Sequence, residues 1–154
     1  MDIYLVSGKG QGPTELSAYD DALLKAGIEH NIIYLSSIIP AGAKIVKKQG
    51  VKLPGEYGDR LYAVVSHNSA SAKNSEAWAG LGWVQDAKTG AGLFVEHHAN
   101  SESAIRNDIT QSLERLMEVR NKEFGPIQML VEGVTYDGQP ASALVAAVFK
   151  AESW

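Results

Sequence analysis

The chain has 154 residues, of which 45% are apolar and 21% charged, a composition typical of one globular domain. Its 14 basic and 18 acidic side chains give a net charge of -4 and form no basic cluster, which argues against a nucleic-acid-binding face. Cysteine is absent, so disulfides, thiolate nucleophiles and cysteine-based metal sites are excluded. The first residues lack the pattern of a signal peptide, and no apolar stretch approaches the ~20 residues of a membrane span. We therefore predict a single cytoplasmic domain over residues 1–154.

The first quarter of the chain predicts two strands with a helix between them. Residues 2–6 form a short apolar, β-branched run, and we interpret the glycine-rich stretch 7–12 that follows as a turn. A helix is predicted from Thr14 to Gly27, because apolar residues recur at helical spacing. These apolar positions are Leu16, Tyr19, Leu23, Leu24 and Gly27. The next apolar run, 31–40, predicts a single strand that ends at a proline.

The middle of the chain is rich in strand signals. Apolar runs predict strands over 61–65 and 91–98, and the Trp- and Gly-rich run 77–84 predicts a strand or a bend. The polar residues 67–75 favour a turn or loop. Glycines at positions 8, 10 and 12 have neither the spacing of a dinucleotide-binding loop nor the ending of a phosphate-binding loop. Strands thus outnumber helices, and helices that cover the outer faces of mixed sheets are the economical arrangement for such a chain.

The last third predicts the longest helix and then two strands. The helix is expected over 101–123, capped by Asn100 or Ser101 and terminated by Gly125-Pro126. Its buried stripe is expected to contain Ile105, Ile109, Leu113, Leu116 and Val119 or Arg120. Two apolar runs then flank Asp137-Gly138, a pair typical of the turn of a β-hairpin.

Three polar sites interrupt these apolar patterns. Asp20 falls within the apolar stripe of the first helix, so it is either a stripe-edge acid with its head in solvent or an anion that receives a cationic group. Ser36-Ser37 divide an apolar strand, and their spacing alone favours two structural serines bonded to nearby backbone. Glu96 ends an apolar run; it is either solvent-facing or a proton donor whose pKa is raised by apolar neighbours.

Histidines near Glu96 are candidate metal ligands, but their spacing does not support a metal site. His97 and His98 are adjacent, and adjacent side chains of a strand point to opposite faces. His67 lies far away in the sequence, and the two-histidine spacing of a helical zinc site is absent. We therefore predict no metal.

Several segments together resemble the pyruvoyl-dependent arginine decarboxylases. They are 16–28 (LSAYDDALLKAGI), 31–40 (NIIYLSSIIP), 43–46 (AKIV) and 92–96 (GLFVE). The resemblance covers most of the chain in order, and its specific part is the tract from Ala22 to Pro40. It implies an α+β fold, a four-layer α/β/β/α sandwich with mixed, largely antiparallel sheets. It also implies a homotrimer or a dimer of trimers, with active sites between subunits.

The resemblance implies a chemistry that accounts for the serine pair. In such enzymes the second serine attacks the carbonyl of the first, and the chain then breaks by β-elimination. Here Ser37 would become a covalently bound pyruvoyl group, and Ser36 would end the smaller fragment as a carboxylate. The pyruvoyl ketone would form a Schiff base with the amine of a cationic amino acid, act as an electron sink, and release carbon dioxide.

The resemblance also assigns roles to other residues. It places Asn31 in self-processing, Glu96 as the proton donor after decarboxylation, and Asp20 beside the guanidinium of arginine. Leu16 and Leu23 would line the pocket beside Asp20. The expected reaction converts arginine to agmatine and carbon dioxide. Two alternatives remain: another amino acid such as histidine as substrate, or a non-catalytic oligomeric binding protein of the same fold.

Overall fold

In a computed structural model that describes residues 1–50 and 52–154, the chain forms two helices and nine strands. In chain order they are β1 (Asp2–Gln11), α1 (Glu15–Lys25), β2 (Asn31–Tyr34), β3 (Ile38–Ile39), β4 (Lys44–Lys47), β5 (Arg60–Ala70), β6 (Glu76–Gln85), β7 (Gly92–Ala99), α2 (Glu102–Arg120), β8 (Gln128–Thr135) and β9 (Ala141–Glu152). Neither helix, in this described part of the chain, offers an apolar stretch that could cross a membrane.

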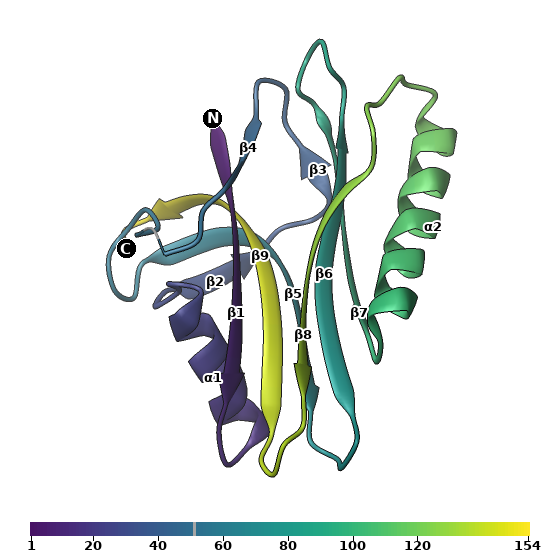
Figure 1. Cartoon of the computed structure of the whole chain (residues 1–154). Helices are drawn as coiled ribbons and strands as arrows, with labels where there is room; N and C mark the ends of the chain where they lie inside the picture. Colours follow the sequence, from purple (N-terminus) through teal and green to yellow (C-terminus); the bar gives the residue numbers. More distant parts are fainter. Residues whose placement is uncertain (51) are drawn as a thin grey trace.

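The strands form two sheets that pack face to face. The five-stranded sheet has the order β2-β5-β9-β1-β4, with antiparallel pairs at its centre and a parallel strand at each edge. The four-stranded sheet, β3-β7-β6-β8, is antiparallel throughout. Helix α1 covers the outer face of the first sheet and α2 the outer face of the second (Figure 1). The predicted four-layer α/β/β/α sandwich with mixed, largely antiparallel sheets is therefore confirmed.

The core lies in three layers that follow the alternation of side chains along each strand. On β9, Leu144 and Val148 pack toward α1, whereas Val145 faces the other sheet. Trp83 and Phe94 fill the space between the sheets, with ring centroids 6.2 Å apart. β9 is apolar on both faces because it lies in the middle of a sheet that is covered on both sides.

Helix α1 packs more closely on its sheet than the sequence predicted. The glycines at 8 and 10 do not form a turn; they continue β1, which runs to Gln11. A Cβ atom on Gly8 or Gly10 would overlap the backbone of Ala22, so these glycines bring the helix against the strand. The buried face of α1 is accordingly made of alanines, and the predicted apolar stripe is wrong at Leu16, whose side chain is 76% exposed.

Two predicted pairings differ from the observed topology. The apolar run 31–40 is not one strand: β2 belongs to the five-stranded sheet and β3 to the four-stranded sheet. The predicted hairpin around Asp137-Gly138 is also wrong, because β8 pairs with β6, and β9 pairs with β1 and β5. Alternation and turn residues indicate where strands begin and end, but they do not determine whether the chain returns to the same sheet or crosses to the one packed against it.

The remaining differences concern element ends. β5 continues through residues 67–70, where a loop was predicted. Helix α2 is capped by Ser101, as predicted, but it ends at Asn121 in the left-handed conformation (φ 47°) rather than at Gly125-Pro126. Its predicted stripe is buried at Ile105, Ile109 and Leu113, partly buried at Leu116, and exposed at Val119 and Arg120.

Candidate active site

The serine pair lies where the chain crosses from one sheet to the other. The Leu35 N–H still donates to the Ala63 carbonyl of β5, at 2.9 Å, whereas the Ser37 carbonyl accepts from the Phe94 N–H of β7, at 2.7 Å. Ser36 is the single residue between these two anchors, and it is exposed. The Ser36–Ser37 peptide bond is therefore accessible, and both of its flanks are held, each by a different sheet.

The β7 contact that holds Ser37 also positions Glu96 nearby. Glu96 follows Phe94 by two residues, so the two side chains share a face of β7 about 7 Å apart along the strand. Ser37 and Glu96 line one open cavity of about 590 Å³, and residues of α2 line its other side. Glu96 is exposed in the single chain, as the solvent-facing alternative predicted, but partial desolvation of its carboxyl group still raises its pKa above the ordinary value, and the charge of His97 opposes this rise. The raised pKa favours the protonated form of this carboxyl group.

The neighbouring histidines point apart, as predicted for a strand. The His97 ring turns toward α2, where its Nε2 lies 2.7 Å from the Ser112 hydroxyl. The His97 carbonyl accepts a hydrogen bond from the Ser66 hydroxyl of β5, and this bond links the two sheets next to Glu96. Nowhere in residues 1–50 and 52–154 do three histidine, aspartate or glutamate side chains converge as metal ligands would.

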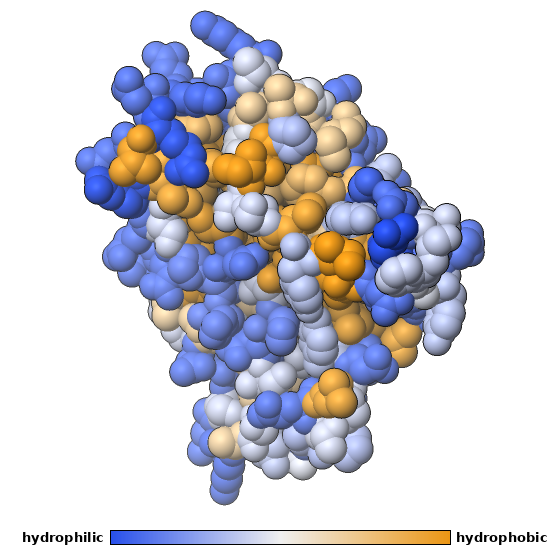
Figure 2. Space-filling model, turned by 180° about the vertical axis from the view of Figure 1, so that it is seen from behind, coloured by the Kyte–Doolittle hydropathy of each residue, from blue (hydrophilic) through white to orange (hydrophobic). Residues whose placement is uncertain are grey.

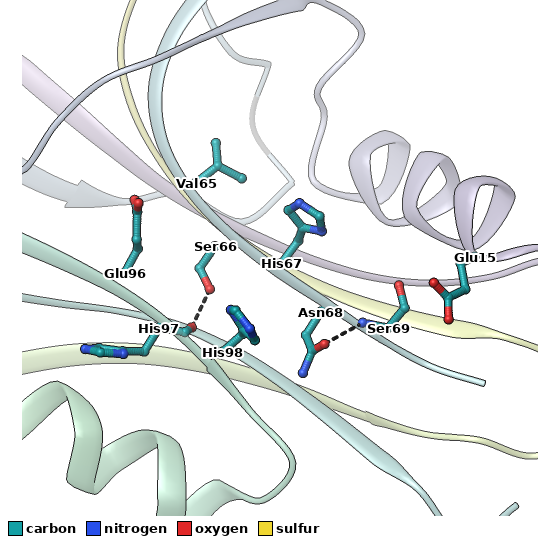
Figure 3. Close-up of a pocket in the computed structure, with 9 residues that line it drawn as sticks. All are labelled: Glu15, Val65, Ser66, His67, Asn68, Ser69, Glu96, His97 and His98. Carbon is teal, nitrogen blue, oxygen red and sulfur yellow. Dashed lines mark hydrogen bonds between the residues drawn. The ribbon is translucent and has the colours of Figure 1, made fainter. Parts of the chain in front are cut away.

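A second cavity, of about 430 Å³, lies on the other side of Glu96. Figure 3 shows its lining residues, which come from β5, from β7 and from Glu15 at the start of α1. His67 of β5 stacks on Tyr19 with ring centroids 4.3 Å apart, and burial, together with His98, lowers the pKa of His67. The sequence reasoning missed this cluster because residues 67–75 were predicted to be a turn or loop, whereas β5 continues to Ala70 and carries these polar side chains directly after its apolar part.

Asn31 lies at the far end of β2 from the serine pair. Its side-chain amide donates to the Gly58 carbonyl at 2.7 Å, and its main-chain N–H donates to the Asp59 carbonyl at 2.8 Å. The four residue steps from Asn31 to Leu35 span about 13 Å in extended conformation. Within one chain, therefore, the structure does not bring the Asn31 amide to the Ser36 carbonyl.

The three predicted substrate-binding residues lie on α1. Asp20 is exposed, which agrees with the alternative of a stripe-edge acid and not with a buried anion; the buried residues of α1 are Ala18 and Ala22, followed by the buried C-cap Ala26. Leu16 is also exposed, whereas Leu23 packs partly against the core. Helices α1 and α2 cover opposite faces of the sandwich (Figure 1). Asp20, Leu16 and Leu23 line neither cavity, although Glu15 at the start of α1 lines the second cavity together with Glu96.

Apolar surface surrounds the sheet crossing. Ile33 and Tyr34 at the end of β2, and Ile38 at the start of β3, are large apolar residues that remain exposed. Figure 2 shows apolar surface gathered on the face of the molecule that is turned away in Figure 1. Exposed apolar patches commonly mark contacts with other protein surfaces.

Comparison with known proteins gives one consistent match over the whole chain. The model of the family described as pyruvoyl-dependent arginine decarboxylase matches residues 2–153. The pyruvoyl-dependent arginine decarboxylase of Halobacterium salinarum is 33% identical over 151 residues, which cover 96% of this chain and 92% of that protein. Those of Methanothermobacter thermautotrophicus and Pyrococcus abyssi are 28% and 29% identical, over 96% and 94% of this chain and 95% and 91% of their own lengths.

Proposed function

The chain belongs to the pyruvoyl-dependent arginine decarboxylase family, and on that premise we propose that it converts arginine to agmatine and carbon dioxide. The observation that carries the proposal is the joint position of Ser37 and Glu96, which line one cavity at an accessible peptide bond between the two sheets. A nucleophilic hydroxyl, a held carbonyl and a carboxyl with a raised pKa are the groups that such a reaction needs.

The serine pair fits the formation of a pyruvoyl group. In the proposed self-processing, the Ser37 hydroxyl attacks the Ser36 carbonyl, and the peptide bond is replaced by an ester. β-Elimination then releases Ser36 as a carboxylate and leaves dehydroalanine, which loses ammonia on hydrolysis and becomes pyruvoyl. The exposed position of Ser36 supports this sequence, and so does the hydrogen bond from Phe94 that holds the Ser37 carbonyl in place.

In turnover, a pyruvoyl carbonyl supplies a site for the substrate amine and accepts the electron pair that carbon dioxide leaves behind. The chain's own contribution is to provide a proton and the apolar walls beside the reacting group. Glu96, whose pKa is raised by partial burial, donates a proton to the α-carbon after carbon dioxide has left. Val95 and Leu116 form apolar walls of the cavity around this step.

We further propose that the complete site forms between subunits of a homotrimer or a dimer of trimers. Asp20, Leu16 and Leu23 would bind the guanidinium end of arginine, but in one chain no residue of α1 lines the cavity that contains Ser37. Asn31, proposed for processing, is likewise too far along β2. A neighbouring subunit would bring these residues to the cavity, and the exposed apolar surface around the crossing favours such a contact. The predicted location of the enzyme is the cytoplasm.

The decisive experiment is mass spectrometry of the denatured protein, combined with measurement of carbon dioxide release. We expect two fragments, 1–36 and 37–154, with the larger one carrying a pyruvoyl end, and release from arginine ahead of histidine and other amino acids. Ser37→Ala should abolish both cleavage and release. An uncleaved chain that borohydride cannot link to arginine would instead favour a non-catalytic binding protein, and preferential release from histidine would overturn the substrate.

A further inference from the structure

The cavity that contains Ser37 and Glu96 has one feature that the proposed reaction has not used, the guanidinium group of Arg115 on α2. Among the described residues that line this cavity, Arg115 is the one arginine or lysine. We propose that Arg115 binds the α-carboxylate of the substrate, the group that leaves as carbon dioxide. Arg115 then determines how much more tightly the site binds an amino acid than the corresponding amine. This inference rests on the proposed decarboxylase function.

Helix α2 is oriented so that a short polar segment faces the cavity. Gln111, Ser112 and Arg115 line it together, at positions that share one side of a helix. The Ser112 hydroxyl is 2.7 Å from Nε2 of His97, the residue that follows Glu96. Buried Leu113 fixes the rotation of the helix against the sheet. Arg115 is therefore one helical turn from Ser112, whose hydroxyl contacts the ring of His97, the residue after Glu96.

The chemistry of the substrate favours a cation in this cavity. An α-amino acid carries its amine and its carboxylate on the same carbon, so an amine held at residue 37 brings the carboxylate into the same cavity. A carboxylate that enters this cavity loses part of its hydration, and this loss opposes binding unless a cation or hydrogen-bond donor compensates it. A guanidinium provides this compensation, and its planar fork forms two parallel hydrogen bonds with a carboxylate.

Arg115 is free to make this contact. Its Nη1 lies 3.1 Å from Oε2 of Glu118, and both side chains are 70% exposed. An exposed ion pair of this kind contributes little to stability, so a substrate carboxylate can compete for the guanidinium. A guanidinium also has five N–H donors, and the contact with Glu118 occupies few of them.

The contact should act on substrate binding more than on the chemical step. The negative charge of the carboxylate disperses as carbon dioxide leaves, so an arginine that pairs with it stabilises the bound substrate more than the transition state. Loss of the guanidinium should therefore raise KM without lowering kcat. Agmatine, which has no carboxylate, should bind equally well with and without Arg115.

The test compares Arg115→Gln with the wild type in the full-length, processed enzyme. We expect unchanged cleavage, a KM for arginine raised ~10-fold, equivalent to about 1.4 kcal/mol, a kcat that does not fall, and an unchanged inhibition constant for agmatine. Arg115→Lys keeps the charge without the fork and should give an intermediate KM. Arg106→Gln is the matched control, because Arg106 pairs with Glu102 on the same helix and does not line the cavity.

Three results would overturn the assignment. They are an unchanged KM in Arg115→Gln, an agmatine inhibition constant that rises in parallel with KM, and a fall in kcat at constant KM. Should the glutamine variant not fold, an Arg115→Lys enzyme with wild-type KM would contradict the proposal equally. Calorimetric binding of arginine and agmatine to an uncleaved Ser37→Ala form, with and without Arg115→Gln, measures the same preference without turnover. A wild-type protein that neither cleaves nor decarboxylates would refute the proposed function instead.

Discussion

Replacement of Glu96 by glutamine separates proton donation from self-processing. Glutamine has nearly the same volume, so the cavity and the hydrogen bond between Phe94 and Ser37 should persist, and cleavage should go to completion. The amide has no acidic proton to give, and a positioned acid–base group typically contributes about 10²–10⁴-fold to the rate. We therefore expect fully cleaved Glu96→Gln with kcat reduced by about two to four orders of magnitude.

The pH dependence of the wild type gives an independent check on Glu96. Partial burial raises the pKa of its carboxyl group, so the folded chain holds this proton more tightly than the unfolded chain. Its contribution to stability is therefore greatest below the unfolded pKa and is lost as pH rises through the raised, folded pKa. In the same window kcat should fall with increasing pH, because the donor loses its proton. Stopped assays of carbon dioxide release across pH, with denaturant unfolding in parallel, would measure both effects. Cleaved Glu96→Gln with wild-type kcat would refute the role of Glu96.

Three further predictions address the core, the assembly and the cut chain. Leu113→Ala should lower the free energy of unfolding by about 2–5 kcal/mol, whereas Val119→Ala, on the exposed side of α2, should change it by less than about 0.5 kcal/mol, as denaturant titration can measure. Co-expression of inactive Asp20→Ala and inactive Glu96→Gln chains should restore part of the activity, because a site between subunits can combine one intact residue from each; activity no higher than that of the separate variants would contradict a shared site. The two fragments should elute together in native size-exclusion chromatography, because β1 lies between β9 and β4 in the five-stranded sheet; separate elution would show that the cut releases the small fragment.

The sequence predicted the layers of the fold but not how the chain connects them. Period-two apolar runs and the helical stripe of α2 carried enough information to locate most strands and the long helix. They did not reveal that the run 31–40 divides between two sheets, because both halves are equally apolar. The misread hairpin at Asp137-Gly138 has the same origin: local turn chemistry is similar whether a strand returns beside its predecessor or crosses to the opposite sheet.

The candidate site was predictable only in part, for physical reasons that differ between residues. Ser36, Ser37 and Glu96 stand out because polar groups interrupt apolar runs, and the structure brings Ser37 and Glu96 to one cavity. Asp20 was selected on the premise of a buried position, yet glycines in β1 draw the alanine face of α1 inward and turn Asp20 outward. Arg115 gave no signal, because an arginine within an exposed helical face is common in sequences, and only the packing of α2 places it at the cavity.

The register of β7 couples the cleavage site to the proton donor. Phe94 anchors the Ser37 carbonyl through its N–H, and its buried ring fixes which residues of β7 face the five-stranded sheet. A slip of one residue would turn Phe94 toward α2 and replace Glu96 by a neighbour of different chemistry. A Cβ atom on Gly92 would overlap the Val84 carbonyl, so a glycine here allows β7 to begin close against β6. The packing that fixes the register of β7 therefore determines both where the chain is held for cleavage and that Glu96 lies near Ser37, the N-terminus that cleavage creates.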